Sequence, residues 1–287
     1  MSLLSPRLVA FLAVAKYKTV HSAANKINLT QTAVTQRIKA LEQSLKTTLF
    51  IRTRKGMKVT PEGEVLLRYC QTITSLEGEV LAKLQGHVVE LEVELSITSE
   101  SSMMRSRVIP SLTPILKKYR NLLFSFRLAD EEKRHVYLKS GQCDFAIIDE
   151  HHLTAEMSYK KLQPEEYVMV CSSTWRKRSL EDILTKERIV DFNSQDQMTF
   201  RYLERYGLSH MNRHQRYYVN STVNIAQLIG SAMGYSVLAK EFAEPYVQAG
   251  DLYILNHGQT LNIQPYLAWY DRPQPPRYFQ EIIDAIC

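Results

Sequence analysis

Thr30-Gln31-Thr32-Ala33-Val34-Thr35-Gln36-Arg37-Ile38-Lys39-Ala40-Leu41-Glu42 is the stretch that decides the fold of the N-terminal part of the chain. Thr30 is a good N-cap, and the apolar residues after it recur at the spacing of a helix over residues 31–45, in one stripe of Val34, Ile38, Leu41 and Leu45. The other side of that helix carries amides, hydroxyls and a base: Gln31, Thr32, Thr35, Gln36 and Lys39. A helix of small residues over 21–27 and a turn at Asn28-Leu29 come just before it. This arrangement predicts a helix-turn-helix whose second helix enters the DNA major groove.

The flanking residues extend this unit on both sides. Ser5-Pro6 predicts the start of a first helix, because Ser caps helices and Pro suits the first helical position. Residues 49–60 predict a hairpin with a turn at Gly56, which has the shape of a wing. Thr60-Pro61-Glu62 then predicts a helix that continues to about residue 88, with a heptad-like seam of Leu66, Tyr69, Ile73, Leu76, Val80 and Leu84. Its length favours a contact with a second copy of the chain; the alternative is an amphipathic helix packed on its own chain.

Charge separates this N-terminal part from the rest of the chain. The chain has 287 residues and a net charge of +6, but residues 1–60 carry eleven Lys and Arg and one acid, Glu42. Those 60 residues therefore have a net charge of +10, and the remainder has −4. A basic module on a mildly acidic body indicates a polyanion partner, here double-stranded DNA, for that module alone. The alternative is a solvated basic surface.

From residue 91 onward, strand-like and helix-like segments alternate. Strands are predicted over residues 91–97, 122–128, 143–149, 167–171, 189–192, 216–219, 235–238 and 266–270, and helices over 103–119, 131–140, 180–184, 197–206, 223–233 and 278–286. Such alternation predicts an α/β fold with largely parallel sheets. The two βα runs suggest two sub-domains with a cleft between them.

By residue 63 the sequence resembles the LysR-type transcriptional regulators. The resemblance is carried by Ser22-Ala23-Ala24, Leu29-Thr30-Gln31-Thr32-Ala33-Val34-Thr35, Ile38, Leu41-Glu42, Leu45, Leu49-Phe50, Arg52 and Thr60-Pro61-Glu62-Gly63. Three positions depart from the family pattern. Lys46 stands where the family usually has Gly, which weakens the expected helix stop, and Thr32 and Thr35 stand where it often has Pro and Ser.

The resemblance covers the whole chain and implies its organisation. Residues 1–60 would form an all-α winged helix-turn-helix, 61–89 a linker helix for dimerisation, and 90–287 a two-lobed α/β effector domain like the periplasmic binding proteins. Lobe I would span about 90–163 and 264–287, and lobe II about 164–263. It also implies sequence-specific DNA binding under control of a small molecule, assembly as a homodimer or homotetramer, and RNA polymerase as a partner.

The effector half is similar to the regulators of lysine and arginine export. Short segments carry this similarity: Ala129-Asp130-Glu131-Glu132, Ser140-Gly141-Gln142, Ile189-Val190-Asp191-Phe192-Asn193, Val219-Asn220-Ser221, Gly250-Asp251-Leu252 and Leu267-Ala268-Trp269-Tyr270. The similarity implies a basic amino acid as the effector.

The candidate DNA contacts fall into three groups. Gln31, Thr32, Thr35 and Gln36 lie at the exposed start of the recognition helix, where amides can bond adenine edges. Arg37 and Lys39 suit guanine or phosphate, and Ser22 and Thr30 suit phosphate at helix starts. In the wing, Arg52, Arg54 and Lys55 can reach a flanking phosphate or the minor groove. For each residue taken singly, a solvated side chain remains the alternative.

The candidate effector residues follow predicted strands, because ligands of such folds bind outside the carboxyl ends of strands. Hydroxyls near a helix start suit a carboxylate, and acidic side chains suit a cationic one; a capping loop is an equally good interpretation of the serines. The set consists of Ser99, Glu100, Ser101, Ser102, Asp130, Asp149, Asn193, Ser221 and Thr222.

Other classes of site find little support in the sequence. His151-His152 with His135 match no standard metal spacing, so no metal site and no cofactor are predicted. No nucleophile motif or P-loop is present, which argues against an enzyme. Cys70, Cys143, Cys171 and Cys287 form no CxxC, which favours free thiols over a redox pair. Residues 1–20 lack a signal-peptide pattern and no long apolar run occurs, so we expect a cytoplasmic protein without a membrane span.

Two alternatives to a ligand-responsive regulator remain at this point. One is a DNA-organising protein with a degenerate ligand cleft. The other is an enzyme or a small-molecule-binding protein fused to a DNA-binding head.

Overall fold

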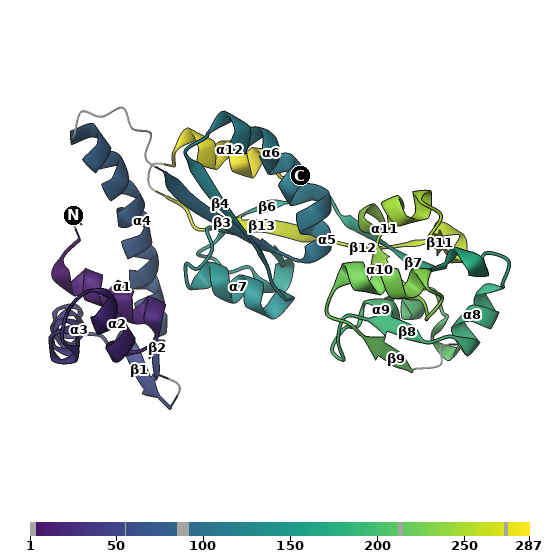
Figure 1. The fold of residues 1–287 in the computed structure, drawn as a ribbon, viewed down its shortest axis with the longest axis horizontal. Coiled ribbons are helices and arrows are strands. Elements are labelled where there is room, and N and C mark those ends of the chain that lie inside the picture. The colour runs from purple at the N-terminus through teal and green to yellow at the C-terminus, as the bar shows by residue number, and fades with distance from the viewer. Residues whose placement is uncertain (1–3, 55, 85–91, 212–214, 273–274) are drawn as a thin grey trace.

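The computed structural model describes residues 4–54, 56–84, 92–211, 215–272 and 275–287. It places three bodies in a row, each with a buried hydrophobic core of its own (Figure 1). We refer to them as the N-terminal unit, the first lobe and the second lobe. The chain therefore combines an N-terminal helical unit with two α/β bodies, and the predicted fold class is confirmed.

The N-terminal unit consists of three helices and a hairpin: α1 (Pro6–Tyr17), α2 (Val20–Lys26), α3 (Gln31–Leu45), β1 (Phe50–Thr53) and β2 (Gly56–Val59). Side-chain caps start all three helices, with Ser5 accepting the N–H of Leu8, Thr19 that of Ser22 and Thr30 that of Ala33. The expected bounds of α3 and the wing hairpin are confirmed. The second helix begins at Val20 rather than at 21, because Thr19 is its cap.

The core of the N-terminal unit uses most of the predicted stripe of α3. Val34, Ile38 and Leu41 are buried against the small residues of α2, Ala23 and Ala24. Leu45, the last residue of the predicted stripe, is not part of this core, since its side chain is 46% exposed. Leu45 lies in the last turn of α3, beyond the part of the helix that packs on α2, and lines a cavity of about 540 Å³ between α1, α3 and α4.

The long helix α4 (Pro61–Leu84) leaves the hairpin and runs alongside the N-terminal unit (Figure 1). Its first turn packs so tightly that a Cβ on Gly63 would lie 2.5 Å from the backbone oxygen of Leu49. Thr60 caps it, accepting the N–H of Gly63 at 3.0 Å. Of the expected seam, Leu66 and Ile73 are half-buried and Tyr69 is exposed. The side chains of Leu76, Val80 and Leu84, and the helix expected beyond residue 84, lie outside the described residues.

The first lobe is a five-stranded sheet in the order β4-β3-β5-β13-β6 with helices on both faces. Helices α6 and α12 lie on one face and α7 on the other (Figure 1). Strands β3, β4 and β5 are parallel, whereas β13 pairs antiparallel with β5 and β6. Its elements are β3 (Val93–Ser99), α5 (Ser101–Met103), a π-helical turn (Met104–Val108), α6 (Ile109–Lys118), β4 (Leu122–Leu128), α7 (Glu131–Lys139), β5 (Phe145–Asp149), a 3-10 turn (Glu150–His152), β6 (Ser158–Lys161), β13 (Pro265–Trp269) and α12 (Arg277–Ala285).

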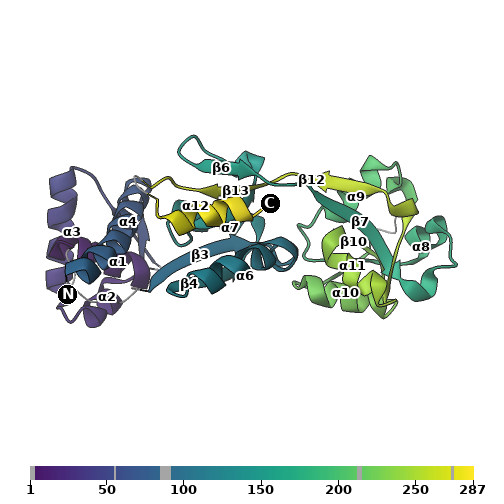
Figure 2. The same ribbon diagram turned by 90° about the horizontal axis from the view of Figure 1, so that it is seen from above.

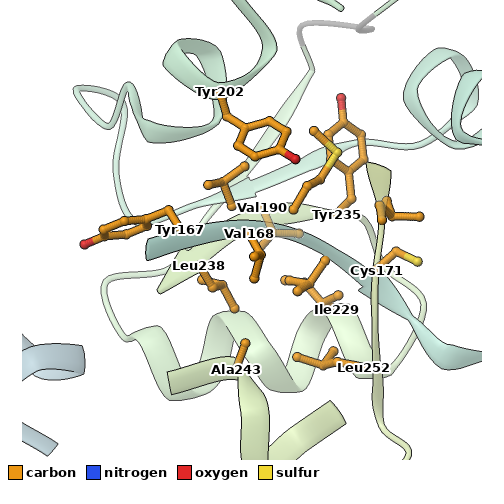
Figure 3. Close-up of a cluster of buried hydrophobic side chains, with 14 of the residues drawn as sticks. Tyr167, Val168, Cys171, Val190, Tyr202, Ile229, Tyr235, Leu238, Ala243 and Leu252 are labelled. Carbon is orange, nitrogen blue, oxygen red and sulfur yellow. The ribbon is translucent and has the colours of Figure 1, made fainter. Parts of the chain in front are cut away.

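The second lobe is built around β7, whose side chains are almost all buried, in the core shown in Figure 3. Its elements are β7 (Glu165–Ser172), α8 (Leu180–Lys186), β8 (Ile189–Asp191), α9 (Met198–Arg205), β9 (Arg216–Tyr218), α10 (Thr222–Gly230), β10 (Ser236–Ala239), α11 (Lys240–Gln248), β11 (Leu252–Ile254) and β12 (Thr260–Ile263). The expectation of largely parallel sheets is wrong here, since β10, β11 and β12 all pair antiparallel with β7. Among the described residues of this lobe, β8 and β9 pair in parallel, and an isolated parallel bridge joins Ile189 to Tyr235. Strands β11 and β12 were not predicted, because segments of three or four residues are too short to show the alternating pattern of a strand.

Two strands carry the chain between the lobes. The outgoing connection becomes β7 and the returning one leaves β12, and the two pair antiparallel with Glu165 opposite Ile263. Next to that pair, the N–H of Leu162 donates to the carbonyl of Pro265 at 3.1 Å. The connection between the lobes is thus a short two-stranded ribbon, visible from above in Figure 2. Residues at the start of β7 consequently face both lobes.

Candidate functional site

A polar face of α3 gathers five of the eleven predicted DNA contacts. Their side chains are exposed and come from the same side of the helix: Gln31, Thr32, Thr35, Gln36 and Lys39. The opposite side is held in the core by Val34, Ile38 and Leu41. We call the five exposed polar residues, Gln31, Thr32, Thr35, Gln36 and Lys39, the recognition face. Because the helix is anchored on one side only, this face is free to enter a groove of DNA.

A histidine on α2 positions the first residue of the recognition face. Nδ1 of His21 lies 3.0 Å from Nε2 of Gln31, and its Nε2 lies 3.3 Å from Nδ2 of Asn25. The ring therefore links the two helices of the helix-turn-helix at their exposed surface. Sequence inspection missed His21, because a lone histidine ten residues from Gln31 carries no spacing pattern.

Several of the predicted hydroxyl contacts already have local partners. Thr35 donates to the carbonyl of Gln31 at 2.8 Å, and Thr30 caps α3. Ser22 is the third residue of α2, half-buried, and not the opening residue that was expected. Thr35 still has free acceptor capacity, whereas the hydroxyl of Thr30 serves first as the cap of α3. Ser22 takes part in the start of α2 through its backbone N–H, which donates to Thr19.

The charged candidates are divided between two surfaces. Arg52 and Arg54 are exposed on the wing, and Lys55 lies outside the described residues. Arg37 is half-buried on another flank of α3, where it lines the cavity near Leu41 and Tyr69. The two wing arginines therefore lie on the exposed surface of the N-terminal unit. Arg37 lies on a different flank of α3 from the recognition face.

Glu42 fixes the wing relative to the recognition helix. Its Oε1 accepts the N–H of Leu49 at 2.8 Å and that of Phe50 at 3.4 Å. Thr60 donates to the carbonyl of Thr48 at 2.7 Å and holds the same segment from the other side. The single acid among the first 60 residues is thus a structural tie between α3 and β1.

The predicted effector residues form two separate groups. Ser99 to Ser102, Asp130 and Asp149 follow β3, β4 and β5, and parallel strands bring these ends to one edge of the first lobe. Asn193, Ser221 and Thr222 lie in the second lobe. Among the described residues, no hydrogen bond or ion pair joins the two groups.

Local partners account for several of these side chains. Asn193 accepts the N–H groups of Gln195 and Asp196, and Ser221 caps α10. Asp130 pairs with Lys133 at 2.8 Å on the surface. In contrast, the buried hydroxyl oxygens of Thr98 and Ser99 have no hydrogen-bond partner. Buried polar groups without a partner are uncommon, so the end of β3 is the part of the set with unused bonding capacity.

Two carboxylates meet at the junction of the lobes. The hydroxyl of Tyr167 donates to Oε2 of Glu165 at 2.9 Å and lies 3.3 Å from Oε1 of Glu100. Glu165 is 2% exposed, and its Oε1 has no partner. Burial, and then the charge of Glu100, raise the pKa of Glu165 to about 9. In Figure 3 the Tyr167 hydroxyl points away from the second-lobe core. We call Glu100, Glu165 and Tyr167 the junction triad.

The nearest cation to the triad is already engaged. Arg107, in the π-helical turn of the first lobe, donates to both carboxylate oxygens of Glu241 on α11, at 2.7 and 2.8 Å. It also donates to the carbonyls of Gln163 and Pro164 at the crossover. The pKa of Arg107 is raised first by the hydrogen bond to Glu241. Arg107 therefore lowers the pKa of Glu165 by charge alone, without neutralising the triad.

Sequence inspection found Glu100 but missed Glu165, Tyr167 and Arg107. Glu165 sits at the start of a strand that the sequence placed only from residue 167. The one available hint was a charged pair, Glu165-Glu166, directly before a buried strand.

The fold also brings the histidines to one place. The ring of His152 stacks on His135, with centroids 4.2 Å apart, and lies tilted against His151, with centroids 4.0 Å apart; Glu131 lies beside them. Spacing did not reveal this group, because Glu131 and His135 come from α7 and the other two from the turn after β5.

The remaining features bear on other kinds of function. A cavity of about 1890 Å³ lies between the N-terminal unit and the first lobe, and neither it nor the smaller one lies at the lobe junction. All four cysteines are free, and burial raises the pKa of Cys171 to about 12 and those of Cys70 and Cys143 to about 11. No helix in the described part of the chain has the length and apolarity needed to span a bilayer.

Comparison with known proteins adds the family. Residues 6–64 match the model for bacterial regulatory helix-turn-helix proteins of the lysR family, and residues 90–286 match the LysR substrate binding domain. The HTH-type transcriptional regulator ArgP of Salmonella typhi is 25% identical over 284 residues, which cover 97% of this chain and 94% of that protein.

Solved structures share the fold of the whole chain. ArgP from Mycobacterium tuberculosis superposes with a TM-score of 0.80 at 20% identity, covering 99% of this chain and 96% of the other. LysG from Corynebacterium glutamicum, solved full-length with bound effector Arg, gives a TM-score of 0.75 at 21% identity and the same coverage.

Proposed function

The chain belongs to the LysR family of bacterial transcriptional regulators, and we propose that a basic amino acid bound between its lobes controls its binding to DNA. As a LysR-type regulator it combines a DNA-binding helix-turn-helix with an effector-binding domain. The family is one of transcriptional regulators, not of enzymes.

For the organisation of the chain, we place the winged helix-turn-helix at residues 1–60, the linker helix at 61–89 and the effector domain at 90–287. Within the effector domain, lobe I spans about 90–163 and 264–287 and lobe II about 164–263. The separate cores of the N-terminal unit and the two lobes support this division.

For DNA, we assign base contacts to the recognition face and phosphate contacts to the wing. Gln31 and Gln36 offer paired amide hydrogen bonds to adenine, and Thr32 and Thr35 offer hydroxyls. Arg52 and Arg54, exposed beside the recognition helix, suit a flanking phosphate. The net charge of +10 over residues 1–60 favours the same surface.

For the effector, the junction triad carries the proposal. The carboxyl groups of Glu100 and Glu165 both contact the hydroxyl of Tyr167, while the nearby guanidinium of Arg107 is paired with Glu241. Burial keeps Glu165 protonated at neutral pH, and a cationic side chain placed there would replace that proton, supplying both a positive charge and a partner for Oε1 of Glu165. The hydroxyls at the end of β3, Ser99 to Ser102, then lie on the same segment as Glu100 and suit the carboxylate of an amino acid. The bound arginine of LysG from Corynebacterium glutamicum supports this choice.

For transmission, α4 contacts the first lobe directly. Arg68 donates to the carbonyl of Lys139 at 2.7 Å, pairs with Glu156 at 3.4 Å and stacks over the ring of Tyr270. A change in lobe closure therefore has a path to the helix that carries the DNA-binding unit. Exposed Val65 and Tyr69 on α4 support assembly as a homodimer or homotetramer.

The test is calorimetric titration of the full-length protein with matched amino acids. L-Arginine is compared with L-citrulline, which has nearly the same shape without the charge, and L-lysine with L-norleucine. We expect one of the basic amino acids to bind and its neutral counterpart to bind at least tenfold more weakly. Absence of binding by both basic amino acids would overturn the proposal. So would a neutral counterpart that binds as tightly as the basic amino acid that it matches.

A footprint on the region upstream of its own gene, with and without the amino acid that binds, tests the coupling. A protected segment that changes with the amino acid supports a regulator. Sequence-independent coverage that ignores it would instead favour a DNA-organising protein.

A further inference from the structure

The side chains of Glu131, His151 and His152 lie together at the edge of the first lobe. Glu131 is the first residue of α7, and the two histidines belong to the 3-10 turn that follows β5. Oε1 of Glu131 is 3.2 Å from Nε2 of His151 and 3.8 Å from Nδ1 of His152. One donor atom from each of the three residues falls within 4.8 Å of the other two.

The ring of His152 is held in place and left without a partner. Its side chain is 14% exposed and lies between the rings of His135 and His151. The Nδ1 atom of His152 is buried and makes no hydrogen bond. An ion pair between His151 and Glu131 would account for the 3.2 Å between their side chains, but not for the unbonded Nδ1 atom of His152. The Nδ1 atom of His152 is buried 3.8 Å from the carboxylate of Glu131 without a hydrogen bond to it, which indicates that a bound ion could lie between them.

The surrounding charges favour a cation. Asp149 lies against Glu131, so that two carboxylates adjoin the two imidazoles. Arg134 is the nearest cation on α7, and its Nη1 donates to the carbonyl of Ile147 at 2.9 Å. Lys133 pairs with Asp130 instead. The group as a whole therefore has more acidic than basic partners.

We propose that Glu131, His151 and His152 bind a divalent cation of the zinc class. Zinc bonds of about 2.0–2.1 Å in tetrahedral geometry separate neighbouring ligand atoms by roughly 3.4 Å. The separations of 3.2 and 3.8 Å bracket that value. Two imidazole nitrogens favour zinc, nickel or copper over magnesium or calcium, which prefer oxygen ligands alone. Asp149 would orient the Glu131 carboxylate from outside the ligand set.

The site is distinct from the junction triad, which lies at the start of β7. Its metal would therefore be a second ligand of the effector domain, in addition to the amino acid. The two proposals stand or fall separately, because zinc binding is measured without any amino acid.

The experiment uses tag-free, metal-free, full-length protein with Cys287 replaced by Ser, so that the exposed thiol does not compete. Titration with ZnCl₂ by calorimetry is expected to show one bound ion per chain. His152→Ala should abolish this binding, and Asp149→Asn should weaken it by about 10–100-fold. His210→Ala, an exposed histidine of the second lobe, is the matched control and should leave it unchanged. Titration with MgCl₂ should show no comparable binding.

Circular dichroism establishes that each variant is folded, and His151→Gln provides a second, more conservative ligand change on the surface. The proposal is overturned if the folded parent binds no zinc. It is equally overturned if zinc binding survives in both His152→Ala and His151→Gln.

Discussion

Arg107 of the first lobe and Glu241 of the second form a two-pronged ion pair, with Nη2 2.7 Å from Oε1 and Nε 2.8 Å from Oε2. The same guanidinium donates to two carbonyls of the crossover between the lobes. Arg107 thus touches the first lobe, the crossover and the second lobe at once. A residue in this position couples the angle between the lobes to the ordering of the crossover.

Replacing Arg107 should loosen the lobe junction. We expect Arg107→Gln to speed hydrogen exchange in α11 by about five- to tenfold, since a partly buried charged pair contributes about 1 kcal/mol. Glu241→Gln should have a similar effect, and the double variant little more than either single one. Arg277→Gln, which breaks the surface pair with Glu281, serves as the control. Exchange in α11 that is the same in Arg107→Gln as in the parent would contradict this role.

Glu165 should make stability depend on pH. Its pKa of about 9 lies above its ordinary value, so the folded state keeps a proton that the unfolded state releases above about pH 4.5. Stability is therefore expected to fall as pH rises from about 5 to 9, with a contribution of about 1.4 kcal/mol per pH unit. Glu165→Gln should remove that slope, giving a higher Tm than the parent at pH 8 and a similar one at pH 5. Glu166→Gln, at the neighbouring half-exposed position, is the matched control.

Gln31 should contribute to specificity rather than to overall affinity. Gln31→Ala is expected to cost about 1–3 kcal/mol on specific DNA and much less on random DNA. His21→Ala should give a smaller loss at the same base pair, because His21 only orients the amide. Gel-shift titrations with single-base operator variants measure both, with Gln248→Ala on α11 as control. An equal loss of affinity on specific and random DNA would show that Gln31 does not contact a base.

Arg54 should act through charge alone. Arg54→Ala is expected to weaken binding to all DNA to a similar extent and to lower the slope of log K against log salt by about 1. Lys117→Ala, an exposed charge on the first lobe, provides a charge-matched comparison. A salt slope equal to that of the parent would rule out a phosphate contact by Arg54.

Lys46 should be a point of strain in the N-terminal unit. It ends α3 with φ 52° in the left-handed region, while the N–H of Thr47 bonds back to the carbonyl of Glu42. Glycine adopts this conformation without the cost of a Cβ, so Lys46→Gly should stabilise the unit by about 0.5–1 kcal/mol. Lys46→Ala keeps the strain and serves as the control. Thermal unfolding followed on the N-terminal unit decides between the outcomes, and a lower Tm for Lys46→Gly would contradict the assignment.

The sequence predicted the N-terminal unit almost residue by residue because its determinants are local. Caps at Ser5 and Thr30, the Thr60-Pro61 start of α4 and the spacing of Val34, Ile38 and Leu41 each act within a few residues along the chain. Although Lys46 replaces the glycine that is usual in the family, α3 still ends where it was expected to, since the backbone hydrogen bonds of residues 42–47 close its last turn. The recognition face followed directly from this local pattern.

The second lobe was predicted less well because its strands are short and pair across long sequence separations. The antiparallel pairing of β12 with β7 joins residues almost a hundred positions apart, and the periodicity of neither segment predicts that they pair. For the same reason the sequence yielded Glu100 without its neighbours Glu165 and Tyr167.

By itself, then, the sequence determined that a basic helix-turn-helix is joined through a long helix to an α/β body. It could do so because periodicity, capping and charge depend on residues that are close together along the chain. Only the tertiary structure decided which side chains share a site. It set His21 beside Gln31, Glu165 beside Glu100, Arg107 against Glu241 and Glu131 next to His151 and His152. Each of these contacts depends on the packing of separate elements, which fixes distances that the order of residues along the chain does not encode locally.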